Sequence, residues 1–155
     1  MDILIEGRPW DTKALPLRYV ISGQSLSPIG IHHGDQLFGI RFDAADYAPD
    51  DRSGSVFLRH RDNPDYDIRK DAIIVLEFEG EASGWLKARQ FDHVEVDDGG
   101  QIWVRSWTYL DGTHEGRHLS RHPLSALRCK VLYAWDGRVT TSRSWMPFSG
   151  RQAAA

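Results

Sequence analysis

The stretch Val20–Phe38, V-I-S-G-Q-S-L-S-P-I-G-I-H-H-G-D-Q-L-F, sets a serine on a glycine-rich corner between two apolar segments. Gly23 lies two residues before Ser25, and a glycine there permits a sharp bend and a close approach of the backbone. A turn signal at Gly34 precedes the next strand-like run, Gln36–Phe42. Backbone N–H groups at such a corner can point towards a substrate, which is the geometry that acyl transfer needs. We therefore treat Ser25 as a candidate nucleophile.

Length and composition favour one globular domain. The chain has 155 residues and a net charge of -3, with Lys and Arg scattered among acidic residues. This balance argues against direct binding of nucleic acid, which usually needs a basic face. No apolar run approaches the roughly 20 residues that cross a bilayer, and the N-terminus lacks the features of a signal peptide. The single cysteine, Cys129, excludes an intramolecular disulfide and a cysteine-based zinc site. We therefore expect a cytoplasmic protein with no membrane association, no cofactor and no metal.

Alternation of apolar and polar residues dominates the chain and predicts a mostly β fold. Asp97-Asp98-Gly99-Gly100 is a strong hairpin signal between two of the expected strands. Helical signals are confined to short turns at Ala44–Asp46 and Ser120–Arg128. The expected strands are Gln36–Phe42, Ser55–Leu58, Ala72–Phe78, Gly84–Phe91, His93–Val96, Gln101–Thr108, Leu127–Ala134 and Arg138–Thr141.

We interpret residues 1–145 as a single domain and residues 146–155 as a tail that has lost the strand pattern. Asp43–Lys70 is dense in charged residues and is expected to loop out over the surface as an insertion at positions 43–70. Trp103 and Trp107 are four residues apart, so they share one face of their strand. We expect this face to pack in the core, and a dimer interface or a peptide-binding groove is the alternative.

Two histidine patterns are candidate metal sites. His32 and His33 are adjacent, so on a strand or turn they point to opposite sides and do not easily chelate one ion. The spacing of His114, His118 and His122 by four residues would align them on a helix. Glycines and a proline around them argue against that helix, and hence against a zinc site.

A candidate base lies on the expected strand Gly84–Phe91. Lys87 stands in the run Trp85-Leu86-Lys87-Ala88-Arg89 and shares a face with Trp85 and Arg89. If that face packs inward, desolvation favours the neutral amine, which can take a proton from a serine. A Ser–Lys dyad is then chemically reasonable, and the alternative is a strand lysine whose ammonium group reaches solvent.

The corner resembles the signature of the LexA/UmuD-like peptidase domains, which are related to signal peptidases. In that family a pattern S-G-x-S-M-x-P, followed by a G-D turn, carries the nucleophilic serine. Leu26 stands here where the family usually has methionine. The matching positions, in order, are Gly23, Ser25, Pro28, Gly34 and Asp35.

The resemblance extends further along the chain. The family shows an apolar strand, an acidic turn, and a strand that carries the dyad lysine followed by a basic residue. Ala72–Phe78, Glu79–Glu81 and Trp85–Arg89 are similar to this arrangement, and Lys87 falls on the lysine. Cys129–Val139 resembles the closing strand and turn of the family more loosely.

The resemblance implies a coiled, multi-strand β domain of the LexA/signal-peptidase type. It implies Ser25 and Lys87 as the catalytic dyad, and the backbone N–H groups of Gln24 and Ser25 as the oxyanion hole. A peptide substrate would lie extended against a sheet edge, and the domain could form a homodimer.

The sequence also departs from the family. Asp43–Lys70 lengthens the separation between serine and lysine, and the cleavable Ala-Gly or Cys-Gly bond of the family repressors has no counterpart in Glu6-Gly7 or Ser22-Gly23. We therefore expect cleavage of a peptide bond in trans, without self-cleavage. The alternative is a catalytically inactive LexA-like module that binds a partner protein or dimerises, possibly in a phage or SOS-type regulatory system, without binding nucleic acid itself.

Overall fold

The computed structural model describes residues 2–5, 8–11, 17–52, 54–78, 85–135 and 141–144, and these confirm a mostly β fold. In the described residues, five short 3-10 turns connect the strands: η2 (Ser27–Ile29), η3 (Ala44–Asp46), η4 (Pro64–Tyr66), η5 (Leu110–Gly112) and η6 (Leu124–Ala126). None of the helices in the described ranges is long and apolar enough to span a membrane. The strands are β1 (Asp2–Ile5), β2 (Arg8–Asp11), β3 (Leu17–Val20), β4 (Gln36–Arg41), β5 (Tyr47–Asp50), β6 (Phe57–His60), β7 (Ile73–Phe78), β8 (Trp85–Val96), β9 (Ile102–Tyr109), β10 (Arg117–Pro123), β11 (Leu127–Trp135) and β12 (Thr141–Ser144).

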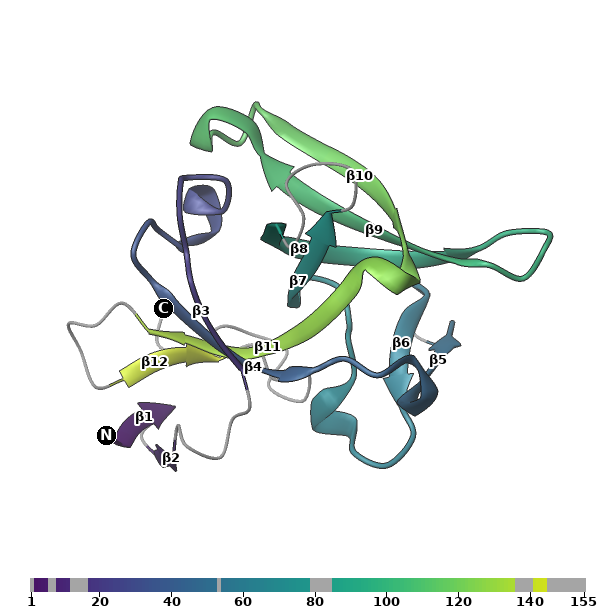
Figure 1. Ribbon diagram of the computed structural model, residues 1–155, viewed down its shortest axis with the longest axis horizontal. Helices are drawn as coiled ribbons and strands as arrows, with labels where there is room; N and C mark the ends of the chain where they lie inside the picture. Colours follow the sequence, from purple (N-terminus) through teal and green to yellow (C-terminus); the bar gives the residue numbers. More distant parts are fainter. Residues whose placement is uncertain are drawn as a thin grey trace.

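The main sheet runs in the order β10-β9-β8-β7-β11-β12-β1-β2 (Figure 1). β11 is its centre, because it pairs with β4 along one edge and with β7 and then β12 along the other. β3 joins the sheet through β4. The hairpin predicted at Asp97-Asp98-Gly99-Gly100 is confirmed, since Val96 pairs with Ile102 across it.

Two elements differ from the prediction, and a third lies mostly outside the described residues. The two strands expected at Gly84–Phe91 and His93–Val96 are one strand, β8, with a bulge between Phe91 and His93. A bulge adds one residue, which reverses the apolar alternation and imitates a strand end in the sequence. The helical turn expected within Ser120–Arg128 is confirmed as η6, but Ser120–Pro123 still belongs to β10. Most of Arg138–Thr141 lies outside the described residues, and β12 is the described antiparallel partner of β11 at that end.

Two hydrophobic clusters lie on opposite faces of β7, as the alternation of this strand requires. Ile73 and Val75 belong to the cluster of the first face, and Ile74 and Leu76 to that of the second face. The first cluster comprises Leu26, Ile31, Leu37, Ile73, Val75, Tyr109, Cys129, Val131 and Ala134. The second comprises Leu58, Ile68, Ala72, Ile74, Leu76, Phe91, Val94, Val104 and Leu127.

Cys129 is buried in the first cluster, as its apolar neighbours in the sequence predict. Burial raises the pKa of its thiol to about 12 because the thiolate would lose its hydration. The side chain of Cys129 lies against the backbone of Gly39 on β4. A small residue is therefore required where β4 crosses this part of β11.

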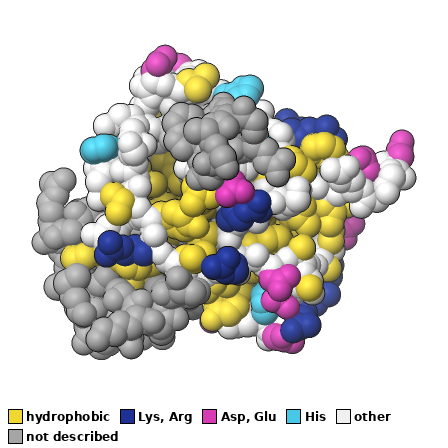
Figure 2. All heavy atoms as spheres, viewed as in Figure 1, with side chains coloured by type: hydrophobic (Ala, Val, Ile, Leu, Met, Phe, Trp, Pro, Cys, Tyr) yellow, Lys and Arg dark blue, Asp and Glu magenta, His cyan; other side chains and the backbone are white. Residues whose placement is uncertain are grey.

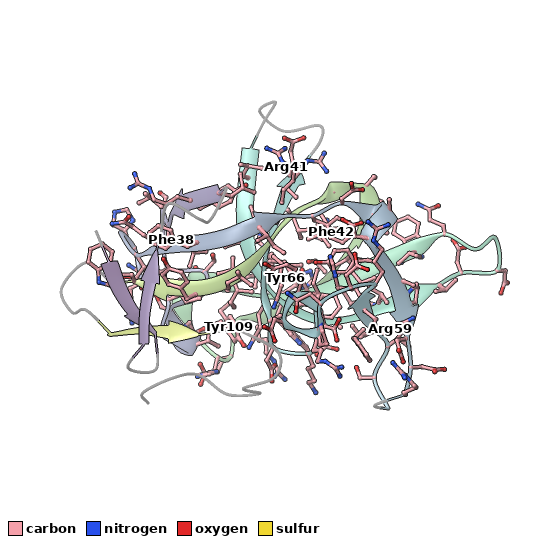
Figure 3. All side chains as sticks on the ribbon, turned by 90° about the horizontal axis from the view of Figure 1, so that it is seen from below. Phe38, Arg41, Phe42, Arg59, Tyr66 and Tyr109 are labelled. Carbon is pink, nitrogen blue, oxygen red and sulfur yellow. The ribbon has the colours of Figure 1, made fainter. Side chains whose placement is uncertain are left out.

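The charged insertion is packed against the sheet, in contrast to the expected surface loop. It forms a two-stranded sheet, β5 with β6, flanked by η3 and η4. Leu58 and Ile68 exchange backbone hydrogen bonds of 3.0 and 2.8 Å and are fully buried in the second cluster. Phe42 and Tyr66 lie on the interior side of this region, whereas Arg41 is exposed (Figure 3). The insertion thus supplies part of the core of the domain.

A buried lysine fixes the insertion to the sheet. Lys130 of β11 is 0 % exposed, and its Nζ donates a hydrogen bond of 2.9 Å to the carbonyl oxygen of Asp65 in η4. Burial lowers the pKa of Lys130 to about 7, and the nearby Asp67 and Asp65 carboxylates oppose that shift only in part.

The two predicted tryptophans share the first face of β9, as expected. Trp107 packs against the first cluster, and the guanidinium of Arg117 lies 4.3 Å from its ring centre. Trp103 is in none of the described clusters, and Arg121 lies 3.7 Å from its ring centre. The expectation of core packing therefore holds for Trp107 and is wrong for Trp103, because Trp103 lies beyond the end of the core and meets a charged side chain of β10.

Lys130 makes stability depend on pH. Above about pH 7 the folded protein loses the Lys130 proton while the unfolded chain keeps it, so the unfolded state binds more protons. We expect the free energy of unfolding to rise by about 1 to 2 kcal/mol between about pH 7 and about pH 8.5. Urea denaturation at several pH values measures this rise. Lys130→Met should abolish this rise. Lys70→Met, at an exposed site, is the control and should retain the rise. An equal rise in the parent and in both variants would show that Lys130 is not its source.

Gly39→Ala should be strongly destabilising. A Cβ atom at this position would meet the Lys130 carbonyl oxygen and would lie 2.6 Å from Cys129 Sγ. Forcing such overlap into a packed core typically costs about 1 to 3 kcal/mol of unfolding free energy, measured by chemical denaturation. Gly99→Ala is the control, because its Cβ would make only one contact, at 3.4 Å to the Asp97 side chain, and stability should change by less than about 1 kcal/mol.

Candidate functional site

The glycine-rich corner is a compact turn between β3 and β4. Gly23 and Gly34 have φ values of +96° and +90°, a region that side chains with a Cβ rarely adopt. Ile21 closes the corner through two backbone hydrogen bonds of 2.8 Å, one with Gly34 and one with Asp35. The Asp35 carboxylate is buried and accepts a hydrogen bond of 2.8 Å from the N–H of His32. Gly23, Gly34 and Asp35 of the motif thus have a structural role here.

The serine of this corner is held against the end of β9. The carbonyl oxygen of Ser25 accepts a hydrogen bond of 2.9 Å from the N–H of Tyr109, the last residue of β9. Gly112 lies against Gln24, the residue before Ser25. A Cβ atom at Gly112 would be 3.1 Å from the Cβ of Gln24. In Figure 1 the η2 turn and the tip of the β9–β10 hairpin accordingly lie close together.

Leu26 anchors the same turn from the other side. It is almost fully buried in the first cluster. Pro28 stands in the first turn of η2, where its missing N–H costs nothing. Figure 2 shows hydrophobic side chains at the bottom of a hollow on the left of this face.

Two backbone N–H groups lie beside the hydroxyl of Ser25. Within the described parts of the chain, no hydrogen bond uses the N–H of Gln24 or of Ser25. Ser25 itself is half-buried, and Gln24 is exposed. Two backbone N–H groups beside a hydroxyl are the donor set that an oxyanion hole requires.

Lys87 is on β8, the strand next to β9. It pairs opposite Leu76 and is half-buried, and Arg89 pairs opposite Ile74, so Lys87 and Arg89 share the second face as expected. The side chain of Trp85 lies outside the described residues. The hydrogen bond between the Ser25 hydroxyl and the Lys87 amine stays a prediction.

Two contacts bring the turn and β8 together. Tyr109, which binds Ser25, also donates its hydroxyl to Gln90 Oε1 at 2.6 Å, and Gln90 lies three residues after Lys87. Ala88 packs against the same cluster that contains Leu26. Ala88 therefore faces the turn that holds Ser25 and Leu26, whereas Lys87 lies on the second face of β8.

The histidines serve other purposes. His33 Nδ1 accepts a hydrogen bond of 3.0 Å from the N–H of Gly23, which fixes the corner. His118 and His122 lie on β10, so the helix considered for them is absent from this described segment. The described residues contain no group of three metal-binding side chains.

Sequence reasoning missed three buried polar groups, two of them at this end of the sheet. The buried lysine with a lowered pKa is Lys130, and its signal was a lysine inside the apolar run C-K-V-L-Y. Gln90 and Tyr109 lie on strands that were predicted, but their hydrogen bond depends on the register between those strands.

Comparison of the chain with protein-family models, curated proteins and solved structures finds no match.

Tyr109→Phe should lower the free energy of unfolding by about 1 to 3 kcal/mol, because it leaves the buried Gln90 side chain without its hydroxyl partner. Hydrogen exchange of the Tyr109 amide, read by NMR, should also become faster as the end of β9 loosens. Tyr66→Phe is the control, since the Tyr66 backbone carbonyl accepts a bond from Tyr47 and is retained. Unchanged exchange at Tyr109 would show that Gln90 does not hold this end of the sheet.

Proposed function

We propose that this domain is a serine peptidase of the LexA/signal-peptidase type that cleaves a peptide bond in trans with a Ser25–Lys87 dyad. The observation that carries the proposal is the docking of Ser25 at the end of β9, beside the strand that bears Lys87. The available N–H groups of Gln24 and Ser25 support it further.

In this mechanism the neutral amine of Lys87 takes the proton of the Ser25 hydroxyl as Oγ attacks the peptide carbonyl. The N–H groups of Gln24 and Ser25 stabilise the oxyanion of the tetrahedral intermediate. The ammonium group of Lys87 then protonates the leaving amine, and an acyl-enzyme remains. Lys87 next takes a proton from water, which attacks the acyl carbonyl and releases the free acid and Ser25.

The test is hydrolysis of a mixture of extended synthetic peptides between about pH 7 and about pH 10, with new termini read by mass spectrometry. Ser25→Ala and Lys87→Ala should each lower the rate by about 100-fold or more. Ser27→Ala, in the same turn, and Lys70→Ala, at an exposed site, are the matched controls and should retain activity. Equal cleavage by Ser25→Ala and the parent, or none by the parent, would reject the peptidase.

One observation favours the alternative function, an inactive module that dimerises or binds a partner protein. β3 pairs with β4, and none of the other described strands pairs with its second edge. Val20 on this strand is 60 % exposed. An open edge with an apolar residue can accept a strand from another chain. If peptide cleavage is absent, a concentration-dependent dimer in sedimentation that Val20→Lys weakens would support the module.

A further inference from the structure

The strand at one end of the described sheet, β10, is basic along its whole length (Figure 1). Its sequence, R-H-L-S-R-H-P, contains two arginines and two histidines and no acidic residue. The nearest acidic residue before it, Glu115, lies in the hairpin tip. β10 pairs with β9, and none of the other described strands pairs with its second edge. An open edge presents backbone N–H and C=O groups that a further strand can bind.

Two exposed arginines of β10 are oriented by tryptophans of β9. The guanidinium of Arg117 lies over the ring of Trp107, at 4.3 Å from its centre. That of Arg121 lies over the ring of Trp103, at 3.7 Å. Each indole N–H in turn donates a hydrogen bond of 3.0 Å to an aspartate carboxylate. A guanidinium that lies over a ring can still direct N–H groups at its rim to a carboxylate, so both cations are placed before a ligand arrives.

The carboxylates of the first face have partners of their own. Glu95 forms an ion pair of 3.1 Å with Arg105, and Asp97 accepts hydrogen bonds from an indole and from its own turn. These bonds lower the pKa of both carboxyl groups, and the charge of Arg121 lowers it further. Among the described residues, no carboxylate forms an ion pair or hydrogen bond with Arg117 or Arg121. The two guanidinium groups therefore keep donors for an external anion.

The backbone of β10 and its arginines favour the same register for an added strand. The N–H of Leu110 donates a hydrogen bond of 2.9 Å to the Gly116 carbonyl oxygen, and this bonded pair sets the alternation along β9 and β10. Leu119 and Arg121 then stand in non-bonded pairs, so their N–H and C=O groups point away from β9. Residues of an added strand opposite Arg117, Leu119 and Arg121 would all lie on the first face.

We propose that β10 binds an extended acidic peptide as an added strand, with acidic side chains opposite Arg117 and Arg121 and an apolar side chain opposite Leu119. The two acidic residues must be four apart, with the apolar residue midway, because every second residue of a strand faces the same side. Strands in a sheet are about 4.8 Å apart, so the peptide lies about 14 Å from β8. Salt screens exposed charges at that separation, so the carboxylates of β8 repel the peptide only weakly. The interaction does not depend on Ser25.

An NMR titration tests this site. It uses the Ser25→Ala chain, so that cleavage at the proposed dyad cannot consume the ligand, and three heptapeptides capped at both ends. T-E-T-V-T-E-T has its Glu residues four apart, T-T-E-V-E-T-T has the same composition with Glu residues two apart, and T-K-T-V-T-K-T reverses the charge. The amides of Leu119 and Arg121 should shift with the first peptide. The affinity for each of the other two should be lower by about fivefold or more.

Arg117→Gln and Arg121→Gln should each weaken binding of the first peptide by up to about fivefold, the range of an exposed ion pair, and together by about tenfold. Arg18→Gln is the matched control, because Arg18 is exposed on β3, another open edge, and affinity should change by less than about twofold. Leu119→Pro should abolish binding while the protein stays folded, because it removes an N–H that points away from β9.

Several results would overturn the proposal. They are absence of shifts at Leu119 and Arg121, equal affinity for the first two peptides, and equal weakening by Arg18→Gln and Arg121→Gln. Tighter binding of an oligothymidylate than of the first peptide at the same amides would make this a nucleic-acid site instead. A dimer in sedimentation that Leu119→Pro dissociates would assign the edge to a second copy of the chain.

Discussion

The hydrogen bond from the N–H of Tyr109 to the carbonyl oxygen of Ser25 is the constraint on which the functional end of the molecule depends. Among the described residues, the ladder between β8 and β9 reaches only as far as Gln90 and Trp107, so the end of β9 takes its partner from the glycine-rich corner. Leu26 then anchors the corner in the first cluster. One backbone bond and one buried side chain thereby place a turn between β3 and β4 beside strands that come more than 60 residues later.

The sheet divides its charges between its two faces. On β8 and β9 the carboxylates of Asp92 and Glu95 bind partners on the first face. The second face carries Lys87 and Arg89, and further along the sheet the buried Lys130 holds the insertion.

Local patterns in the sequence were sufficient for the β class, for the hairpin at Asp97-Asp98-Gly99-Gly100 and for the short turn Ala44–Asp46. They failed at β8, because a bulge reverses the alternation from which a strand is recognised. They also failed for Asp43–Lys70, where charged residues surround buried apolar side chains, among them Leu58 and Ile68. The many charged residues predict that such a segment is exposed to solvent. They do not show that its few apolar side chains pack in the core.

For the candidate site, the sequence predicted the individual residues of the corner but not their contacts with distant strands. Gly23, Gly34 and Asp35 form the corner that their residue types imply, because positive φ values and a buried capping carboxylate are local properties. The placement of Ser25 next to Tyr109 depends on how distant strands meet, which no short segment determines. The lysine whose charge is most affected by burial, Lys130, lies on another strand from the proposed base.

The buried thiol of Cys129 gives the protein an internal reporter of opening. A thiol that is fully covered and held in its protonated form does not react with an alkylating reagent until the first cluster comes apart. The alkylation rate of this sole cysteine therefore measures how often the core is exposed under native conditions. A substitution that abolishes a function while leaving that rate unchanged has acted on the chemistry of the surface and not on the integrity of the fold.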